Sequence, residues 1–456
     1  MGKRNTLPFL FPIRSHPVFI VLSVAVAIFT DTFLYGLLIP VFPTLLQERG
    51  FVADNHIQIF TSILIGLMGA GVIGGCYNSK ERRSSLLGGL GLLLLSTVAM
   101  WLAQNVATLC IARFVQGVAS AAVWSVGLAL LTDTVGGDHV AEIMGWVNIA
   151  FSCGFMAGPV VGGLLYASAG YHAVFAIASG LLVVDLVYRL LIIEKREARQ
   201  LLALQNDADE EGARRPLLEG NREHTIEHKR DSAYDILVTS RRLMISLVCA
   251  FVQALLVASI EATLPIRLKA IFGYGSGQSG LMFMTLMIPS VLAPLIGYFC
   301  GRFGNAIIAL SGYLVCGTAA ILLRLSDHND TESKIVLIIL LVMIGIAMCM
   351  IMTPVLTEVF AAVEELEEES PGRFGQYGAF AQAYALFDIA YAGGAFIGPI
   401  FAGLVISKFS WNVMTLTLGI LSFLTSLLVL PETIANFKHR KMGGEEDVTE
   451  SVETSE

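Results

Sequence analysis

The sequence predicts an all-α integral membrane protein in which twelve transmembrane helices form two six-helix bundles. Three observations lead to this prediction: the composition, the number of long apolar runs, and a motif that occurs once in each half of the chain. Of the 456 residues, 55% are hydrophobic and only 14% are charged. One soluble core cannot hide so many apolar side chains behind an ordinary polar surface, so lipid must solvate much of the chain.

Twelve apolar runs are long enough to cross a membrane, because a helix needs roughly 20 apolar residues to span a hydrocarbon core of about 30 Å. The first run carries Asp31 in its middle and lacks a small-residue cleavage pattern, so we expect a retained helix rather than a signal peptide. In chain order the runs are Val18–Pro40, Ile57–Tyr77, Leu86–Ala107, Leu109–Thr132, Glu142–Ala167, Tyr171–Ile193, Leu243–Pro265, Gly280–Phe299, Asn305–Leu323, Ile335–Val359, Phe380–Ile406 and Val413–Pro431.

A polar stretch over residues 194–242 separates the first six runs from the last six and offers little that could pack as a domain. We therefore predict bundles over 18–193 and 243–431, this linker between them, and tails over 1–17 and 432–456. Loops rich in Lys and Arg stay on the cytosolic side of a membrane. With the N-terminus inside, 21 of the 29 Lys and Arg residues fall in cytosolic segments, 6 in the opposite loops and 2 within helices. Both tails and the linker are thus expected in the cytosol.

A glycine and proline motif in the fifth run recurs in the eleventh run at an offset of 240 residues. The paired positions are Gly154 with Gly394, Gly158 with Gly398, and Pro159 with Pro399. Glycine at four-residue spacing lets helices approach closely, and proline permits a bend. Plain helix packing explains one such motif, but copies in corresponding helices predict two related bundles with a binding site between them near the membrane midplane.

Four ionisable residues stand out within the predicted spans: Asp31, Arg113, Glu261 and Asp388. Each costs about 2.5 to 3.5 kcal/mol at a helix centre on insertion scales, so we expect the acids to face an interior cavity and to bind a cation or a proton. The alternatives are a structural role for the acids and, for Arg113, a side chain that reaches the membrane surface. Asp185 and Arg189 lie four residues apart, and we expect them to form a structural ion pair.

The fifth run contains the complete pattern Gly-x-x-x-Gly-Pro-x-x-Gly-Gly at Gly154, Gly158, Pro159, Gly162 and Gly163. This pattern resembles the antiporter signature of proton-coupled drug exporters in the major facilitator superfamily. The segments around Arg113, Glu261 and Asp388 are similar to the vesicular amine transporters of that superfamily. The resemblance implies the major facilitator fold, binding or coupling of a cationic substrate by Asp31 and Glu261, and a part for Arg113 in proton coupling.

The chain also departs from the vesicular amine transporters. No base lies near Ser62, where these relatives carry a lysine that pairs with the acid matching Asp388, and no acid precedes Pro354. Thr32 replaces the asparagine that follows their first acid, so recognition of a monoamine is not implied.

The superfamily's loop signature is only partly retained. The copy after the second run keeps its charges at Arg82 and Arg83, and the copy after the eighth run keeps Arg302. We expect these three arginines to belong to the gating loops on the cytosolic side.

Together these features predict a proton-coupled antiporter that moves a small organic cation, drug or amphipathic metabolite out of the cytosol, across the plasma membrane or a vacuolar or vesicular membrane. We expect a monomer in the lipid bilayer that binds a small-molecule substrate and no nucleic acid, and that uses a proton gradient and no cofactor. Two alternatives stay open, an uncoupled facilitator or importer and a transporter-like membrane sensor. An enzyme is not expected, because the spans hold no nucleophile, metal-ligand constellation or nucleotide-binding loop.

Overall fold

The computed structural model describes residues 17–76, 82–135, 140–190, 233–369 and 379–431, and nearly all of these residues are helical. Hydrocarbon offers no water to backbone N–H and C=O groups, and a helix satisfies these groups within one segment. The prediction of an all-α membrane fold is confirmed. Most of the predicted linker and of both predicted tails lies outside the described residues.

The N-terminal half contains one very long helix that is divided by a break. Gly170 has φ of +76°, a value that glycine adopts without steric strain, and the helix axis changes there. The helices of this half are α2 (Pro17–Leu38), α3 (Val41–Glu48), α4 (Ile57–Cys76), α5 (Arg82–Trp101), α6 (Val106–Val135) and α7 (Val140–Leu190).

The C-terminal half repeats this plan with an interruption in its second membrane-spanning segment. The short 3-10 turn η3 (Ile288–Leu292) contains Pro289 and separates two helices that together cover one predicted run. The helices of this half are α9 (Ala233–Thr239), α10 (Arg241–Phe272), α11 (Ser276–Met287), α12 (Ala293–Phe303), α13 (Asn305–Leu322), α14 (Thr331–Glu369), α15 (Phe380–Lys408) and a last helix over Trp411–Pro431.

The described helices account for the twelve predicted crossings. Ten segments are long and apolar enough to span a membrane, and one of these, Ile149–Leu190, is 42 residues long and contains the break at Gly170. A further apolar helix, Leu87–Trp101, is shorter. Counting the broken segment as two crossings and adding the shorter helix gives the twelve that the sequence predicts.

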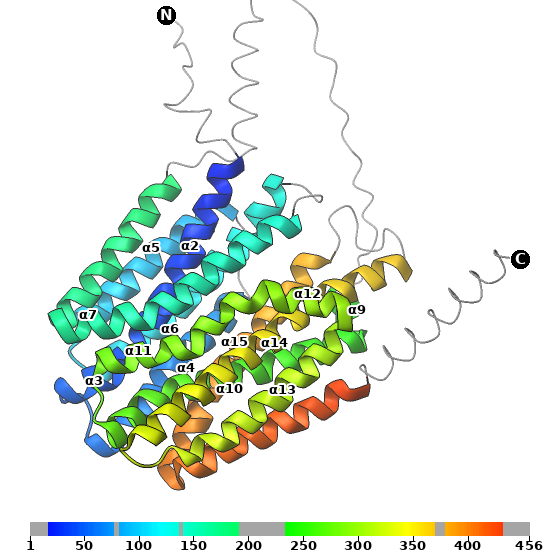
Figure 1. Ribbon diagram of the computed structural model, residues 1–456. Coiled ribbons are helices and arrows are strands. Elements are labelled where there is room, and N and C mark those ends of the chain that lie inside the picture. Colours follow the sequence, from blue (N-terminus) through cyan, green and yellow to red (C-terminus); the bar gives the residue numbers. More distant parts are fainter. Residues whose placement is uncertain (1–16, 77–81, 136–139, 191–232, 370–378, 432–456) are drawn as a thin grey trace, which may run out of the picture.

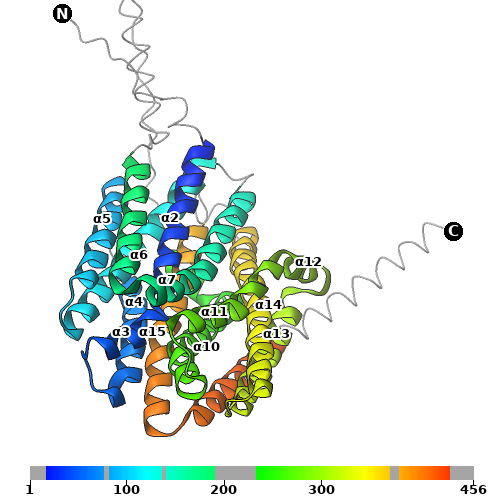
Figure 2. The ribbon, with the colours of Figure 1, turned by 60° about the vertical axis from the view of Figure 1, so that its left-hand side comes forward.

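Each half packs around one closely paired set of helices. In the N-terminal half α2 lies along α7, and in the C-terminal half α10 lies along α15 (Figure 1). Between the halves, α4 lies beside α15 and α11 lies beside α7 (Figure 2). The largest cluster of buried apolar side chains draws residues from both halves, so the interface between them is part of the core.

Candidate functional site

Asp31 lies in α2 and is buried, with 3% of its surface exposed. Its Oδ2 atom accepts hydrogen bonds from Ser120 Oγ at 2.6 Å and from Trp124 Nε1 at 2.9 Å, both on α6. Its Oδ1 atom accepts none from the described residues. The carboxylate is therefore held in place by neutral donors and no described cation pairs with it.

Glu261 lies in α10, on the other side of the interface between the halves, and only 1% of its surface is exposed. Its Oε2 atom accepts a hydrogen bond of 2.7 Å from the hydroxyl of Tyr35, while Oε1 has no described donor. Tyr35 stands one helical turn after Asp31 on α2. One turn of α2 therefore carries the first carboxylate and contacts the second across the interface.

Arg113 on α6 is completely buried, so its side chain does not reach the membrane surface. Its Nη1 atom donates to Gln116 Oε1 at 2.5 Å, and Nε and Nη2 make no hydrogen bond with described residues. The guanidinium carbon lies 5.4 Å from the ring centre of Tyr35 and 5.3 Å from that of Phe42. Such cation–π contacts stabilise a buried arginine. Tyr35 thus contacts both Arg113 and Glu261.

Asp388 on α15 is not joined to this group of side chains. It is partly exposed, and no hydrogen bond or ion pair links it to another described residue. Where a lysine would pair with it in the vesicular amine transporters, Ser62 instead accepts a hydrogen bond from Gln58 at 3.2 Å and lies against Gly403. Of the acids of the C-terminal half, Glu261 and not Asp388 is therefore the one bound by a residue that stands one turn from Asp31.

A row of aromatic rings connects the donors of the two acids. Trp124, which binds Asp31, meets Phe151 edge to face at 5.7 Å between ring centres. Phe151 stacks on Phe155 at 5.8 Å, and Phe155 stacks at 5.8 Å on Tyr35, which binds Glu261. This aromatic wall, from Trp124 to Tyr35, therefore joins the residues that donate to the two acids.

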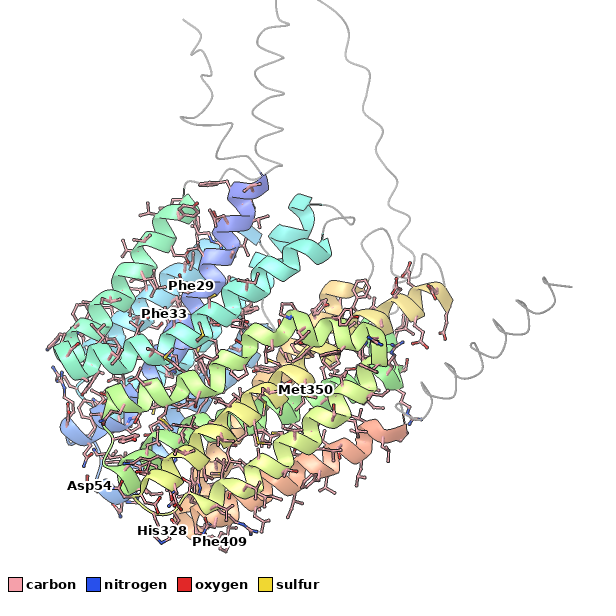
Figure 3. The ribbon with its side chains drawn as sticks, in the orientation of Figure 1. Phe29, Phe33, Asp54, His328, Met350 and Phe409 are labelled. Carbon is pink, nitrogen blue, oxygen red and sulfur yellow. The ribbon has the colours of Figure 1, made fainter. Side chains whose placement is uncertain are left out.

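The motif glycines bring α7 against the backbone of α2. A Cβ atom added at Gly158 would lie 2.6 Å from the carbonyl oxygen of Phe33, and one at Gly162 would lie 2.1 Å from that of Leu37. At Gly154 the nearest atom would be Thr32 Oγ1 at 2.2 Å. Phe33 and its stacked neighbour Phe29 project from this part of α2 (Figure 3).

The second copy of the motif makes the equivalent contact in the C-terminal half. Added Cβ atoms at Gly394 and Gly398 would lie 2.0 Å and 2.4 Å from backbone oxygens of α10. Gly163 differs from the other motif glycines, because it faces the carbonyl of Ser276 on α11 in the opposite half. The motif thus packs within each half and also between the halves.

Of the gating-loop arginines, Arg302 is exposed on α12, with its guanidinium carbon 5.7 Å from the ring centre of Phe303. Arg82 begins α5, but its side chain and that of Arg83 lie outside the described residues. The prediction for these arginines therefore stays a prediction.

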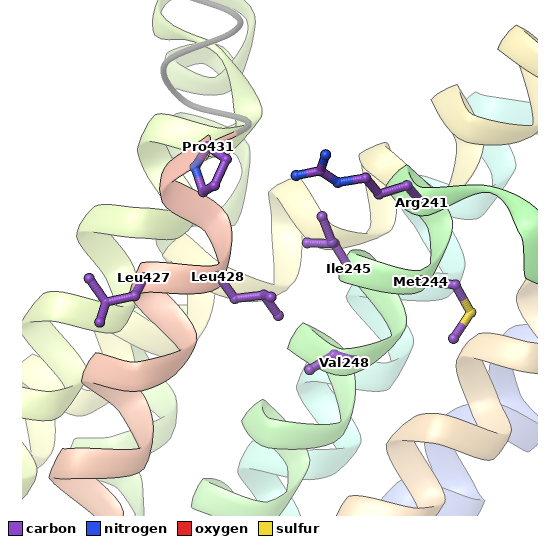
Figure 4. A pocket seen from close by; sticks show the side chains of 7 residues that line it. All are labelled: Arg241, Met244, Ile245, Val248, Leu427, Leu428 and Pro431. Carbon is purple, nitrogen blue, oxygen red and sulfur yellow. The ribbon is translucent and has the colours of Figure 1, made fainter.

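A groove of about 400 Å³ lies away from these residues, between the first turns of α10 and the last helix (Figure 4). Its walls are mainly apolar and contain none of the candidate site residues. The lining residues are Arg241, Met244, Ile245, Val248, Leu427, Leu428 and Pro431. We assign it no part in substrate binding.

From the sequence, no role was assigned to four residues of this site: Tyr35, Gln116, Ser120 and Trp124. Gln116, Ser120 and Trp124 recur every fourth residue on α6, which places them on one helix face toward α2. The sequence therefore contained a pattern, a polar and aromatic helix face, from which these three residues could have been found. Tyr35 gave a weaker signal, because only the packing of the two halves shows that its hydroxyl meets Glu261.

Comparison with known proteins identifies the family. A family model described as the Major Facilitator Superfamily matches residues 24–367. The chain belongs to the major facilitator superfamily. This major facilitator protein is 30% identical to the MFS-type transporter ppzB of Metarhizium rileyi, over 91% of this chain and 94% of that one.

Two further relatives extend the comparison. The probable vesicular acetylcholine transporter-B of Danio rerio is 24% identical over 88% of this chain and 76% of its own. The crystal structure of the human organic anion transporter MFSD10 superposes with a TM-score of 0.59 and 20% identity, over 91% of this chain and 99% of that one. The superposition supports the fold, and these relatives are named as transporters rather than enzymes.

Proposed function

We propose that this protein is a secondary active transporter that exchanges protons for a small organic cation, drug or amphipathic metabolite by alternating access. The observation that carries the proposal is the pair of buried carboxylates, Asp31 and Glu261, each held through one oxygen by neutral donors. A buried charged carboxylate needs a proton or a bound cation to balance it. When these two ligands compete for the same acids and arrive from opposite sides, the transporter exchanges one for the other.

The aromatic wall from Trp124 to Tyr35 supports an organic cation as the substrate. A desolvated cation over an aromatic face gains on the order of 2 kcal/mol. The similarity to a protein named as an acetylcholine transporter agrees with this class, since acetylcholine is a cation. The likeness to the organic anion transporter concerns the fold alone.

The hydrogen bond from Tyr35 to Glu261 supports a link between the charge on Glu261 and the arrangement of the halves. Two further bonds cross between the halves at the same end, from Gln58 Nε2 to Ala262 O at 3.2 Å and between Lys269 and Gln47. By the distribution of Lys and Arg, this is the outer end. A hydrogen bond to a charged acceptor is stronger than one to a neutral acceptor. Neutralising Glu261 therefore weakens one of the bonds that hold the outer end closed.

Replacing Tyr35 with phenylalanine is expected to shift the protein toward its outward-open form by about tenfold, equal to about 1.4 kcal/mol. The ring that stacks on Phe155 is kept, but the bond to Glu261 is lost, and bonds to charged groups contribute about 1.5–3 kcal/mol. Spin labels at Asp54 and His328, which lie at this end on opposite halves, would report the change by double electron–electron resonance in a cysteine-depleted background (Figure 3).

Tyr166→Phe is a matched control for this experiment. Tyr166 also donates to a glutamate, Glu48, at 2.6 Å, but both residues lie in the N-terminal half. The control should leave the label distances unchanged. If Tyr35→Phe also leaves them unchanged, Tyr35 does not contribute to outer closure.

The proposed exchange is tested by uptake into proteoliposomes with an acidic lumen, using a panel of labelled organic cations and amphipathic metabolites. Antiport predicts accumulation of at least one compound and its loss when a protonophore collapses the gradient. Flux that is indifferent to the gradient would instead indicate an uncoupled facilitator. Binding without any flux would indicate a membrane sensor.

The proposal extends to the surroundings of the protein. We infer a multi-pass monomer in the plasma membrane or in a vacuolar or vesicular membrane, with both termini in the cytosol, a proton gradient as energy source and no cofactor. Export from the cytosol is the direction favoured by the antiporter pattern in α7. Protease accessibility of tags at the two termini in sealed vesicles checks the orientation.

A further inference from the structure

Asp185 and Arg189 form a second buried charged group, away from the interface between the halves. They lie one turn apart in the second part of α7, with 0% and 4% of their surfaces exposed. The expected ion pair is not formed. Neither oxygen of Asp185 and none of the three guanidinium nitrogens of Arg189 makes a hydrogen bond or ion pair with a described residue.

Both side chains face the inside of the N-terminal half. Ala178 and Leu182 precede them on the same face of α7, at the spacing of one helical turn each. Those two residues belong to a buried cluster with side chains of α2, α5 and α6, namely Ala27, Leu34, Leu90, Leu93, Ala119 and Val123. Asp185 and Arg189 therefore continue a surface that packs inside the N-terminal half, not at the interface with the other half.

This surface leads toward Asp31. On α2, Ala27 and Leu34 stand one turn to either side of Thr30 and Asp31. Thr30 Oγ1 and Asp31 Oδ1 are buried and make no hydrogen bond with described residues.

The polar groups of α5 on this side are already satisfied. The hydroxyls of Ser96 and Thr97 both donate to the carbonyl of Leu93, at 2.9 Å and 2.8 Å. On α7 the unsatisfied atoms belong to Ser179, Asp185 and Arg189, and on α2 to Thr30 and Asp31. Arg113 and Gln116 on α6 carry further unsatisfied atoms. Along the two helices, the atoms of α7 and α2 form a series from Arg189, close to the end of α7, to Asp31.

Such a series requires water. A carboxylate or guanidinium that is buried without partners is destabilised by several kcal/mol, and internal water molecules relieve this by making about three hydrogen bonds each. We propose that Asp185 is a second proton-binding site, joined to Asp31 by a water-filled path inside the N-terminal half that is separate from the substrate route. The inference rests on the proposed proton exchange.

In this path a proton passes from the carboxyl of Asp31 through water to Asp185, which leaves Asp31 as a carboxylate free to bind the cation. Asp185 then gives the proton to water near the end of α7. The guanidinium of Arg189 balances the charge of Asp185 once the proton has left. No covalent bond to substrate is formed, and each proton taken up by Asp31 is released at the other end.

The test separates proton movement from substrate movement. Substrate counterflow without a gradient requires only binding and the change of facing, whereas accumulation driven by an acidic lumen also requires proton transfer. We expect Asp185→Asn to keep counterflow within about twofold and to lose at least about tenfold in driven accumulation, or about 1.4 kcal/mol. Glu332→Gln, which neutralises an exposed acid in the first turn of α14, should change neither quantity.

The double variant Asp185→Asn/Arg189→Gln separates a proton site from a structural one. If Asp185 only balances Arg189, removal of both charges restores driven accumulation, and the proposal is overturned. If Asp185 is a proton-binding site, driven accumulation stays low in the double variant. Full driven accumulation in Asp185→Asn, or equal losses in both assays, also overturns the proposal. If the native protein shows counterflow but no response to the gradient, the proposed proton exchange fails instead.

Discussion

Replacing Asp31 with asparagine is expected to reduce gradient-driven accumulation by about a hundredfold or more, equal to about 2.8 kcal/mol. Asparagine has nearly the same shape and can still accept hydrogen bonds from Ser120 and Trp124. It cannot carry a negative charge, so it neither balances a cation nor releases a proton. Accumulation of the best compound of the panel in proteoliposomes measures the loss.

Ser120→Ala is the control for this prediction. It removes one donor of the carboxylate and leaves the charge and the bond from Trp124. Because the carboxylate that binds the proton and the cation is kept, accumulation should fall less than in Asp31→Asn. Accumulation by Asp31→Asn at the native level would rule out this residue as the shared site of proton and cation.

Gly162→Ala is expected to destabilise the protein by about 1–3 kcal/mol, because overpacking forces a well-packed interior to move. The new methyl group would lie 2.1 Å from the carbonyl oxygen of Leu37, a backbone atom that has no flexible end to turn aside. Thermal unfolding in detergent should show a lowered midpoint. Gly394→Ala, at 2.0 Å from the oxygen of Phe251, should have a similar effect in the other half.

Gly180→Ala provides the comparison within the same helix. No atom lies within 4 Å of a Cβ added there, so the methyl group meets open space. Its midpoint should stay at or above the native value, since alanine favours a helix over glycine by up to about 1 kcal/mol. An equal fall in both variants would mean that glycine matters here for backbone conformation rather than for close approach.

The helices could be predicted from the sequence because apolar runs report directly on contact with lipid. The run predicted at Asn305–Leu323 appears as α13 with nearly the same bounds, and that at Phe380–Ile406 as α15. The break at Gly170 falls between the two predicted runs Glu142–Ala167 and Tyr171–Ile193. The interruption at η3 was not predicted, because it divides the single predicted run Gly280–Phe299 into two helices. Apolar composition does not report such a local change of direction within one run.

The site was predictable where a charge is expensive to bury, and less so where only geometry matters. Asp31, Glu261 and Arg113 stand out in any apolar segment and are buried. Tyr35 has no distinguishing feature in the sequence. Its hydroxyl contacts Glu261, which lies 226 positions further along the chain, and only the folded structure shows this contact. The unsatisfied state of Asp185 and Arg189 was likewise hidden, since their spacing alone favours a pair.

The glycines at the interface between the halves also bear on the speed of transport. Gly163 and Gly280 place α7 and α11 against each other through backbone atoms, and Gly66 and Gly69 do the same for α4 with α15. Surfaces of this kind carry few interlocked side chains. In the proposed alternating-access cycle the halves can therefore separate without rotamer changes, which keeps the activation barrier of the motion low even though the two surfaces are in tight contact.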